Sequence, residues 1–430
     1  MLEDSLRDPT GLITLREQCL KIQQLANKNQ LRHFDVDSTK FQDMVDLRDY
    51  QGMPDQMPMY GQWYRFGCHG QIKTLLQSWQ GVSPLAQTQR LVDLFVVASA
   101  LDVESVSRQR SWHYKDPKTS RAIGGSQGIA MATLDLFKAG AFSCDPQDPF
   151  RVDGEKLKTP GQPTHFRVSL QPKSASHLPG LEDRLSLLQH IGHVLQSQPC
   201  FRGDQGTSFR PGHFIDYLLD HHATIHTKKG PLIPLETLWP GAMQLGELWA
   251  RPEGDIQDCP SLLLDSATSM EAKIPFHKYT QWLIYSISEP MEKLLGATIE
   301  GKDLLTPVPD HWQGGLLLDT GFLTLKPEET KRGLDQFSKN AKRLGQVQME
   351  VAPMFEKDDP VVIEWRALTV AYMDIIADQV RQALRQTRTS LPLSKFMEAG
   401  SYSVGKDLAE ISRPLTQVPP IMIRPSAHLV

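Results

Sequence analysis

The chain has 430 residues, of which 40% are hydrophobic and 22% are charged, and its formal net charge at pH 7 is −4. This length predicts one large domain or a few ordinary ones, with a substantial buried core. A slightly acidic chain provides no general positive field for a phosphate backbone, which disfavours nucleic acid as a partner.

The start of the chain, MLEDSLRD, lacks the basic and apolar regions of a secretory signal, and it is too acidic for a transit peptide. No apolar run approaches the roughly 18 residues that a membrane helix requires. Five cysteines are scattered singly, without a CxxC pair. This pattern argues against disulfides and structural zinc, so we expect a cytoplasmic protein. Because no apolar run is long enough for a membrane helix, we also expect no membrane partner.

Apolar residues recur with helical spacing in most of the chain, whereas alternation typical of strands is scarce. The best strand candidates are 165–171 (HFRVSLQ) and 314–325 (GGLLLDTGFLTL), and the charged segment 326–357 is expected to be a surface helix or a flap. The sequence therefore predicts a mainly α protein with one large domain over 1–430 and a possible N-terminal helical subregion over 1–80. The expected helices cover 12–29, 85–100, 128–140, 180–198, 276–295 and 360–388.

The last of these helices has clear signals at both ends. Asp359 is a good N-cap and Pro360 suits the first helical position. Arg381, Arg385 and Arg388 gather near its end, where positive charge complements the helix dipole.

The stretch IPFHKYTQWLIYSI (274–287) combines an apolar helix with several polar side chains. On a helix, Phe276, Tyr279, Leu283 and Ile287 form an apolar stripe. A second stripe contains Lys278, Gln281 and Tyr285, with His277 beside it, as in the wall of a pocket for a polar or phosphorylated small molecule. The alternative is that these groups reach solvent, the lysine by extending its stem.

Two carboxylates lie in apolar surroundings. Asp319 follows an apolar run and precedes a turn, a position suited to a general base, although such an aspartate commonly bonds its own turn. Glu364 lies on an apolar helix with Arg366 and Asp374, and buried charges are normally paired or functional. A structural ion pair between Glu364 and Arg366 is the alternative.

The segment SWHYKDP (111–117) mixes aromatic, basic and acidic residues, as in a pocket that stacks a planar group, and Trp112 is its candidate. Asp102 precedes it, at the end of an apolar helix. The glycine-rich turn GGSQGIA (124–130) enters a helix and is neither a Walker loop nor a Rossmann fingerprint.

The three histidines of HHATIH (221–226) are compatible with a metal site. Because they lie in a polar, loop-like segment, we expect them to be exposed to solvent instead. The chain contains no HExxH, GxSxG or paired CxxC motif. We therefore expect no metal and no cofactor.

Five segments, taken in order along the chain, resemble the uracil-catabolism protein four family of fungi and bacteria. They read SWHYKDP, SQGIAMATLDLFKAGAFS, PFHKYTQWLIYS, GGLLLDTG and VIEWRALTV. The resemblance covers about residues 11–401, and the ordered set is specific although each piece alone is not. It implies a step of pyrimidine degradation acting on a ribose phosphate that carries an opened ring.

A more distant resemblance is to the queuosine 5′-phosphate N-glycosidase family, which has a helical fold related to DNA glycosylases. In this resemblance, one motif of that family corresponds to Phe276, Lys278 and Gln281. The aspartate of a second motif corresponds to Asp319. A third motif is matched by Glu364, Arg366 and Ala367. Asp102 and Trp112 match an aspartate and tryptophan of that family, here with a longer spacer.

Together these resemblances imply an N-glycoside hydrolase whose partner is a small phosphorylated riboside. Asp319 is the expected catalytic carboxylate, and Glu364 is expected to act either as a second acid/base or as the group that orients Arg366. The resemblance gives phosphate binding to Lys278 and His277 and contact with ureido or sugar oxygens to Gln281. The alternatives are a non-catalytic carrier of a phosphorylated intermediate and a metal-dependent hydrolase.

Overall fold

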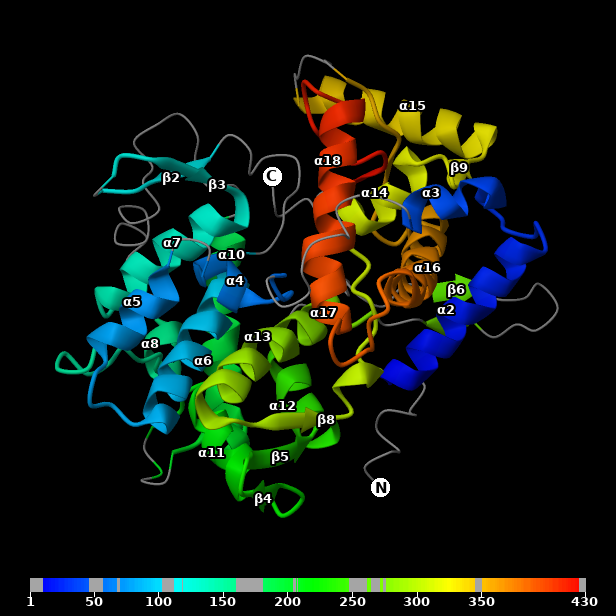
Figure 1. Cartoon of the computed structure of the whole chain (residues 1–430). Helices are drawn as coiled ribbons and strands as arrows, with labels where there is room; N and C mark the ends of the chain where they lie inside the picture. The colour runs from blue at the N-terminus through cyan, green and yellow to red at the C-terminus, as the bar shows by residue number, and fades with distance from the viewer. Residues whose placement is uncertain are drawn as a thin grey trace. The chain divides into compact units, whose positions relative to one another are not determined.

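The computed structural model describes residues 11–45, 57–67, 70–102, 112–117, 119–159, 181–203, 206, 208–246, 261–263, 271–273, 276–344 and 350–424. It is mainly helical with a few short strands, which confirms the predicted class (Figure 1). The strand predicted at 165–171 lies outside the described residues.

The chain forms two compact units that draw on alternating parts of the sequence. The first contains Met1–Tyr60, Pro252–Lys278 and Asp303–Pro425. The second contains Gly61–Arg251, Tyr279–Lys302 and Ser426–Val430. The expectation of one domain over 1–430 stays a prediction.

The first unit is built around helices from both ends of the chain. Its helices are α2 (Leu12–Asn27), η1 (Ser38–Lys40), α3 (Phe41–Val45), α14 (His311–Asp319), α15 (Pro327–Leu344), α16 (Pro360–Ala383), α17 (Leu393–Lys395), the π-helix η8 (Phe396–Tyr402) and α18 (Ser403–Ser412). Its strands are β1 (Phe34–Val36), β6 (Ser261–Leu263), β7 (Glu271–Lys273), β9 (Leu323–Leu325), β10 (Met354–Phe355) and β11 (Met422–Ile423). β1 pairs antiparallel with β9, β6 antiparallel with β7, and β10 parallel with β11.

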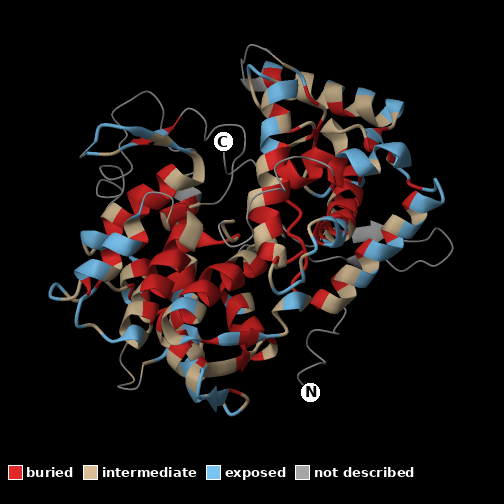
Figure 2. Ribbon diagram, in the orientation of Figure 1, coloured by how far each residue is buried: buried red, intermediate tan, exposed pale blue. Residues whose placement is uncertain are grey.

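In this unit α14 packs against both α16 and α18, and most of its residues are buried (Figure 2). Two glycines permit the close approach. A Cβ on Gly314 would lie 2.7 Å from the Trp365 ring, and one on Gly405 would lie 2.1 Å from the Trp312 carbonyl oxygen. The Trp365 indole N–H donates to the Gly314 carbonyl at 2.9 Å, so the contact is polar as well as apolar.

The second unit contains the longer apolar helices and a small sheet. Its helices are α4 (Gln62–Gly67), α5 (Gln71–Ser78), α6 (Pro84–Leu101), α7 (Gly125–Lys138), α8 (Gly154–Lys158), α10 (Leu181–Ser197), η5 (Pro199–Phe201), α11 (His213–Asp220), α12 (Leu235–Gly246) and α13 (Lys278–Leu295). The first residue of α13, Lys278, belongs to the first unit, and the short helix η7 (Lys302–Leu304) has its first residue in the second unit and the other two in the first. Its strands are β2 (His113–Lys115), β3 (Ala122–Gly124), β4 (Ile225–Thr227), β5 (Gly230–Pro234) and β8 (Thr298–Glu300). β2 pairs with β3, and β5 lies between antiparallel β4 and parallel β8.

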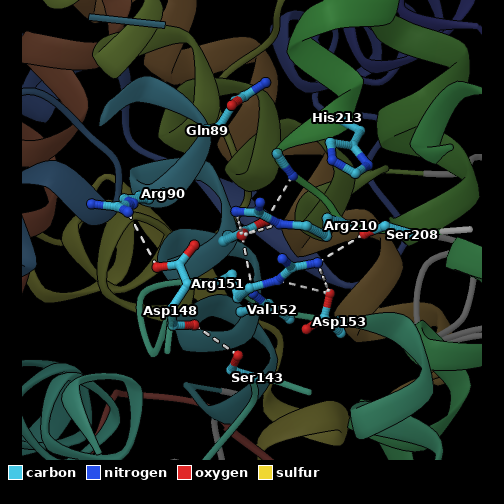
Figure 3. Close-up of polar contacts among 12 residues, drawn as sticks. Gln89, Arg90, Ser143, Asp148, Arg151, Val152, Asp153, Ser208, Arg210 and His213 are labelled. Atoms are coloured by element: carbon cyan, nitrogen blue, oxygen red, sulfur yellow. Dashed lines mark hydrogen bonds and ion pairs between the residues drawn. The ribbon is translucent and has the colours of Figure 1, made fainter. Parts of the chain in front are cut away.

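A buried carboxylate, Asp93 on α6, organises the polar core of the second unit. It is fully buried and accepts hydrogen bonds from the Arg210 guanidinium at 2.5 and 3.0 Å. The backbone N–H groups of Val152 and Gly212 donate to it at 3.0 and 2.7 Å. Arg151 bonds Asp153 and Ser208 beside this group (Figure 3). These hydrogen bonds to Asp93 hold the two connecting segments that contain Val152 and Gly212 against α6.

The predicted helices are confirmed, with small shifts at their ends. Asp359 caps α16 by accepting the Val361 N–H at 3.0 Å, as expected from the sequence. The helix ends at Ala383 rather than at residue 388, because Arg385 adopts a left-handed conformation with a φ of 53°. The Gln386 N–H then donates back to the Arg381 carbonyl at 2.8 Å, which closes the helix end.

The strand predicted at 314–325 is wrong for its first half. Residues through Asp319 form α14, and only Leu323–Leu325 are extended. Asp310 starts the helix, because its side chain accepts the Trp312 N–H at 2.8 Å. A helix buried on all sides shows no helical period, so an apolar run of this kind resembles a strand.

Within α13 lies a buried acid, Glu289, that titrates unusually. Its carboxyl faces Lys293, with an N–O distance of 3.3 Å, and only 6% of its side chain is exposed. Burial raises the pKa of Glu289 to about 7, although Lys293 and Lys302 act in the opposite direction. The carboxyl is therefore partly protonated at neutral pH.

We expect Glu289→Gln to remove a pH dependence of stability. Because the pKa of Glu289 rises from 4.5 to about 7 on folding, its contribution is complete below pH 4.5 and is lost as the pH rises through 7. The loss is on the order of 3 kcal/mol. Thermal melts at pH 5 should nearly coincide for both proteins, whereas at pH 8 the variant should melt a few degrees higher. A difference that is constant between pH 5 and 8 would contradict this assignment.

Candidate active site

The start of α13 places two predicted residues in the first unit. His277 directly precedes the helix, is buried, and has a left-handed φ of 47°, which is uncommon outside glycine. Such backbone conformations cluster at functional sites. Lys278 follows with 33% of its side chain exposed, so it is neither fully covered nor free in bulk solvent.

Lys278 is paired with Asp310, the N-cap of α14. The Lys278 ammonium lies 3.3 Å from Asp310 Oδ2. The other carboxylate oxygen accepts the Trp312 N–H at 2.8 Å and lies 3.6 Å from His311 Nδ1. Only 6% of the Asp310 side chain is exposed. The structure therefore brings a lysine, a carboxylate and an imidazole together at one helix start.

The Asp310 carboxyl is kept ionised in this setting. Burial by itself would raise its pKa, but the neighbouring His311 and Lys278 and the Trp312 N–H act against burial. Their combined effect holds the pKa of Asp310 below its usual range. A buried anion that a partly exposed cation contacts is a suitable group for stabilising positive charge on a substrate.

Asp310 and His311 are not among the residues that the sequence analysis selected. A signal for them exists, because an aspartate followed three positions later by a glutamine, Gln313, is typical of a helix N-terminus. The partnership with Lys278 has no such signal, since the two residues are 32 positions apart.

Asp319, the expected catalytic carboxylate, ends α14 at the opposite end from Asp310. Nine helical residues span about 13 Å, so Asp319 is not brought to Lys278. Arg413 binds both of its oxygens, at 2.8 and 2.6 Å, and the two side chains are 14% and 6% exposed. This geometry is that of a bidentate ion pair. The catalytic role expected of Asp319 stays a prediction.

Glu364 is buried on α16 and bonds backbone rather than a cation. Its two carboxylate oxygens accept the N–H groups of Arg32 and His33 at 3.2 and 3.0 Å. It thereby holds the segment that leads into β1. Arg366, two residues further along α16, is partly buried. The catalytic role expected of Glu364 stays a prediction.

The other predicted binding residues belong to the second unit. Gln281 and Tyr285 are buried along α13, as are Leu283 and Ile287, whereas Lys278 and Tyr279 at the start of the same two stripes are partly exposed. Trp112 is buried against α7, where a Cβ on Gly128 would lie 3.2 Å from its ring. Asp102 follows the last residue of α6. Their roles toward a substrate stay predictions.

The histidines of HHATIH are engaged in local contacts. His221 Nδ1 accepts the Ala223 N–H at 3.2 Å, and His226 Nε2 bonds the Leu219 carbonyl at 3.0 Å. Within the described ranges, no three His, Cys, Asp or Glu side chains gather as metal ligands. Among the helices of the described part, none has the length and apolarity needed to cross a bilayer.

Comparisons with known proteins match this chain over nearly all of its length. A family model described as a protein of unknown function (DUF1688) matches residues 10–427. Uracil catabolism protein 4 of Lachancea kluyveri is 32% identical over 418 residues, which are 92% of this chain and 91% of that protein. Protein urg3 of Schizosaccharomyces pombe is 29% identical over 433 residues, with 97% of each chain covered.

Proposed function

The chain belongs to the family described as a protein of unknown function (DUF1688), and on this premise we propose that it is an N-glycoside hydrolase of uracil catabolism. The name of the Lachancea kluyveri relative supports the pathway. The proposed substrate is a ribosylurea-like or nucleoside 5′-phosphate. The contact between Lys278 and buried Asp310 is the observation that carries the proposed reaction.

Cleavage of an N-ribosidic bond builds positive charge on the sugar in an oxocarbenium-like transition state. The ionised Asp310 carboxylate stabilises that charge and accepts a proton from the attacking water. The water oxygen bonds to C1′ while the bond from C1′ to nitrogen breaks. The proton passes to the leaving nitrogen, so a ribosylurea phosphate yields ribose 5-phosphate and urea.

Lys278 serves two purposes in this scheme. Together with His311, its ammonium lowers the pKa of Asp310 and so keeps the carboxylate ionised, because nearby positive charge favours the charged form. A third of its side chain is exposed, so it is accessible to an anionic substrate such as a sugar phosphate. His277, which precedes it, is the second candidate for that phosphate. In this proposal Asp310 has the catalytic role that the sequence predicts for Asp319.

The purified full-length chain tests the proposal directly. It is incubated with ribosylurea 5′-phosphate, its unphosphorylated form and several nucleoside monophosphates, and urea, base and ribose 5-phosphate are measured. We expect urea and ribose 5-phosphate in equal amounts, with much slower release from the unphosphorylated compound. Thermal stabilisation by these ligands without any product would contradict hydrolysis and indicate a carrier instead.

A further inference from the structure

The side chain of Gln313, on the first turn of α14, is completely buried with one of its polar atoms unused. Its Nε2 donates to Ser401 Oγ at 3.0 Å. Its Oε1 has no hydrogen-bond partner among the residues that the structure describes. Buried carbonyl oxygens in proteins are nearly always bonded, so this one requires an explanation.

The usual partner of such a glutamine is engaged elsewhere. In a capping box, a glutamine three residues after the N-cap accepts the backbone N–H of the N-cap residue. Here the N–H of Asp310 donates to the Val308 carbonyl at 2.7 Å. The Ser401 contact meanwhile holds the other end of the amide. The acceptor therefore has no local structural use.

Gln313 lies on the same side of the helix start as Asp310, because positions three apart on a helix are neighbours. Ser401 belongs to the π-helix η8, and Met397 of the same segment accepts the Val308 N–H at 3.5 Å. η8 thus lies along the segment that leads to Asp310. π-helical turns occur frequently at functional sites. Asp310 and Gln313 are therefore neighbours at the start of α14, and Lys278 contacts the Asp310 carboxylate there.

We propose that Gln313 recognises the leaving group, and that it selects open-chain ureido ribosides over nucleotides with an intact pyrimidine ring. This inference rests on the proposed hydrolase function. In a ribosylurea the nitrogen bonded to C1′ carries a hydrogen, and the terminal NH₂ provides two more donors. In an intact uracil nucleotide the same nitrogen carries none. An oriented amide oxygen near Asp310 therefore favours the opened ring.

The test measures selectivity in Gln313→Met, which keeps the length of the side chain but removes its acceptor. The compounds are ribosylurea 5′-phosphate and uridine 5′-monophosphate, in which the nitrogen bonded to C1′ carries no hydrogen. We expect the preference of wild type for the first compound, in kcat/KM and in affinity, to exceed that of the variant by roughly 10- to 100-fold. Equal losses on both substrates would indicate a merely structural glutamine and overturn the inference.

A second variant and a second readout keep the test decisive. Ser401→Ala releases the amide without removing its oxygen, so it should reduce the selectivity by a smaller factor than Gln313→Met. Calorimetric dissociation constants for the same two compounds report the selectivity even if no turnover occurs. Wild type that binds ribosylurea phosphate selectively without cleaving it would refute the hydrolase and retain the recognition role. Binding of both compounds with equal affinity would refute that role.

Discussion

Asp310→Asn is expected to fold like the wild type and to release urea from ribosylurea 5′-phosphate about 10³-fold more slowly. Asparagine is as good an N-cap as aspartate, so the bond from the Trp312 N–H is retained. The negative charge that stabilises the oxocarbenium-like transition state is lost. Lys278 loses its anion but is partly exposed, so water solvates it at small cost. Steady-state urea release and a thermal melt measure the two effects.

Asp319→Asn is the matched control at the other end of the same helix, and it should show the opposite pattern. It removes the anion that neutralises Arg413, of which only 14% is exposed. An unpaired buried guanidinium is expected to lower the free energy of unfolding by about 3 kcal/mol. The turnover of each folded molecule should not change. Loss of turnover in Asp319→Asn with full activity in Asp310→Asn would return the catalytic role to Asp319.

The helices could be predicted because their signals are local. Asp359 and Pro360 mark the start of α16 within two adjacent residues, and the structure confirms the cap. α14 shows no helical period in the sequence, because five of its nine residues are glycine or leucine and seven consecutive residues, from His311 to Leu317, are buried. The cap at Asp310 is the stronger signal there.

The partners of buried charges could not be predicted, because they come from distant parts of the chain. Glu364 bonds the N–H groups of Arg32 and His33, more than 300 residues earlier. A sequence pattern shows that a charge will be buried in a helix, but not which group will meet it. The same limit applies to Lys278, for which the sequence predicted a pocket lining role without identifying Asp310.

Asp93→Asn is expected to produce the largest loss of stability, about 4 kcal/mol, because it breaks a fully buried charge network. The carboxylate accepts from Arg210 and from two backbone N–H groups. An asparagine has one acceptor oxygen instead of two, and its NH₂ group must face one of these donors. Arg210 is also left buried without a full negative charge beside it. Urea denaturation monitored by circular dichroism measures the loss.

Asp148→Asn provides the control from the same connecting segment. Asp148 pairs with Arg90 at 3.1 Å, but 31% of its side chain is exposed, so its loss should cost less than about 1 kcal/mol. Both substitutions remove one negative charge and change the size of the side chain little. The difference between the two losses in free energy of unfolding therefore measures the effect of burial and of the four N–H donors around Asp93. Equal small losses in both variants would mean that water replaces the lost bonds at Asp93, and that the connecting segments are held to α6 by apolar packing alone.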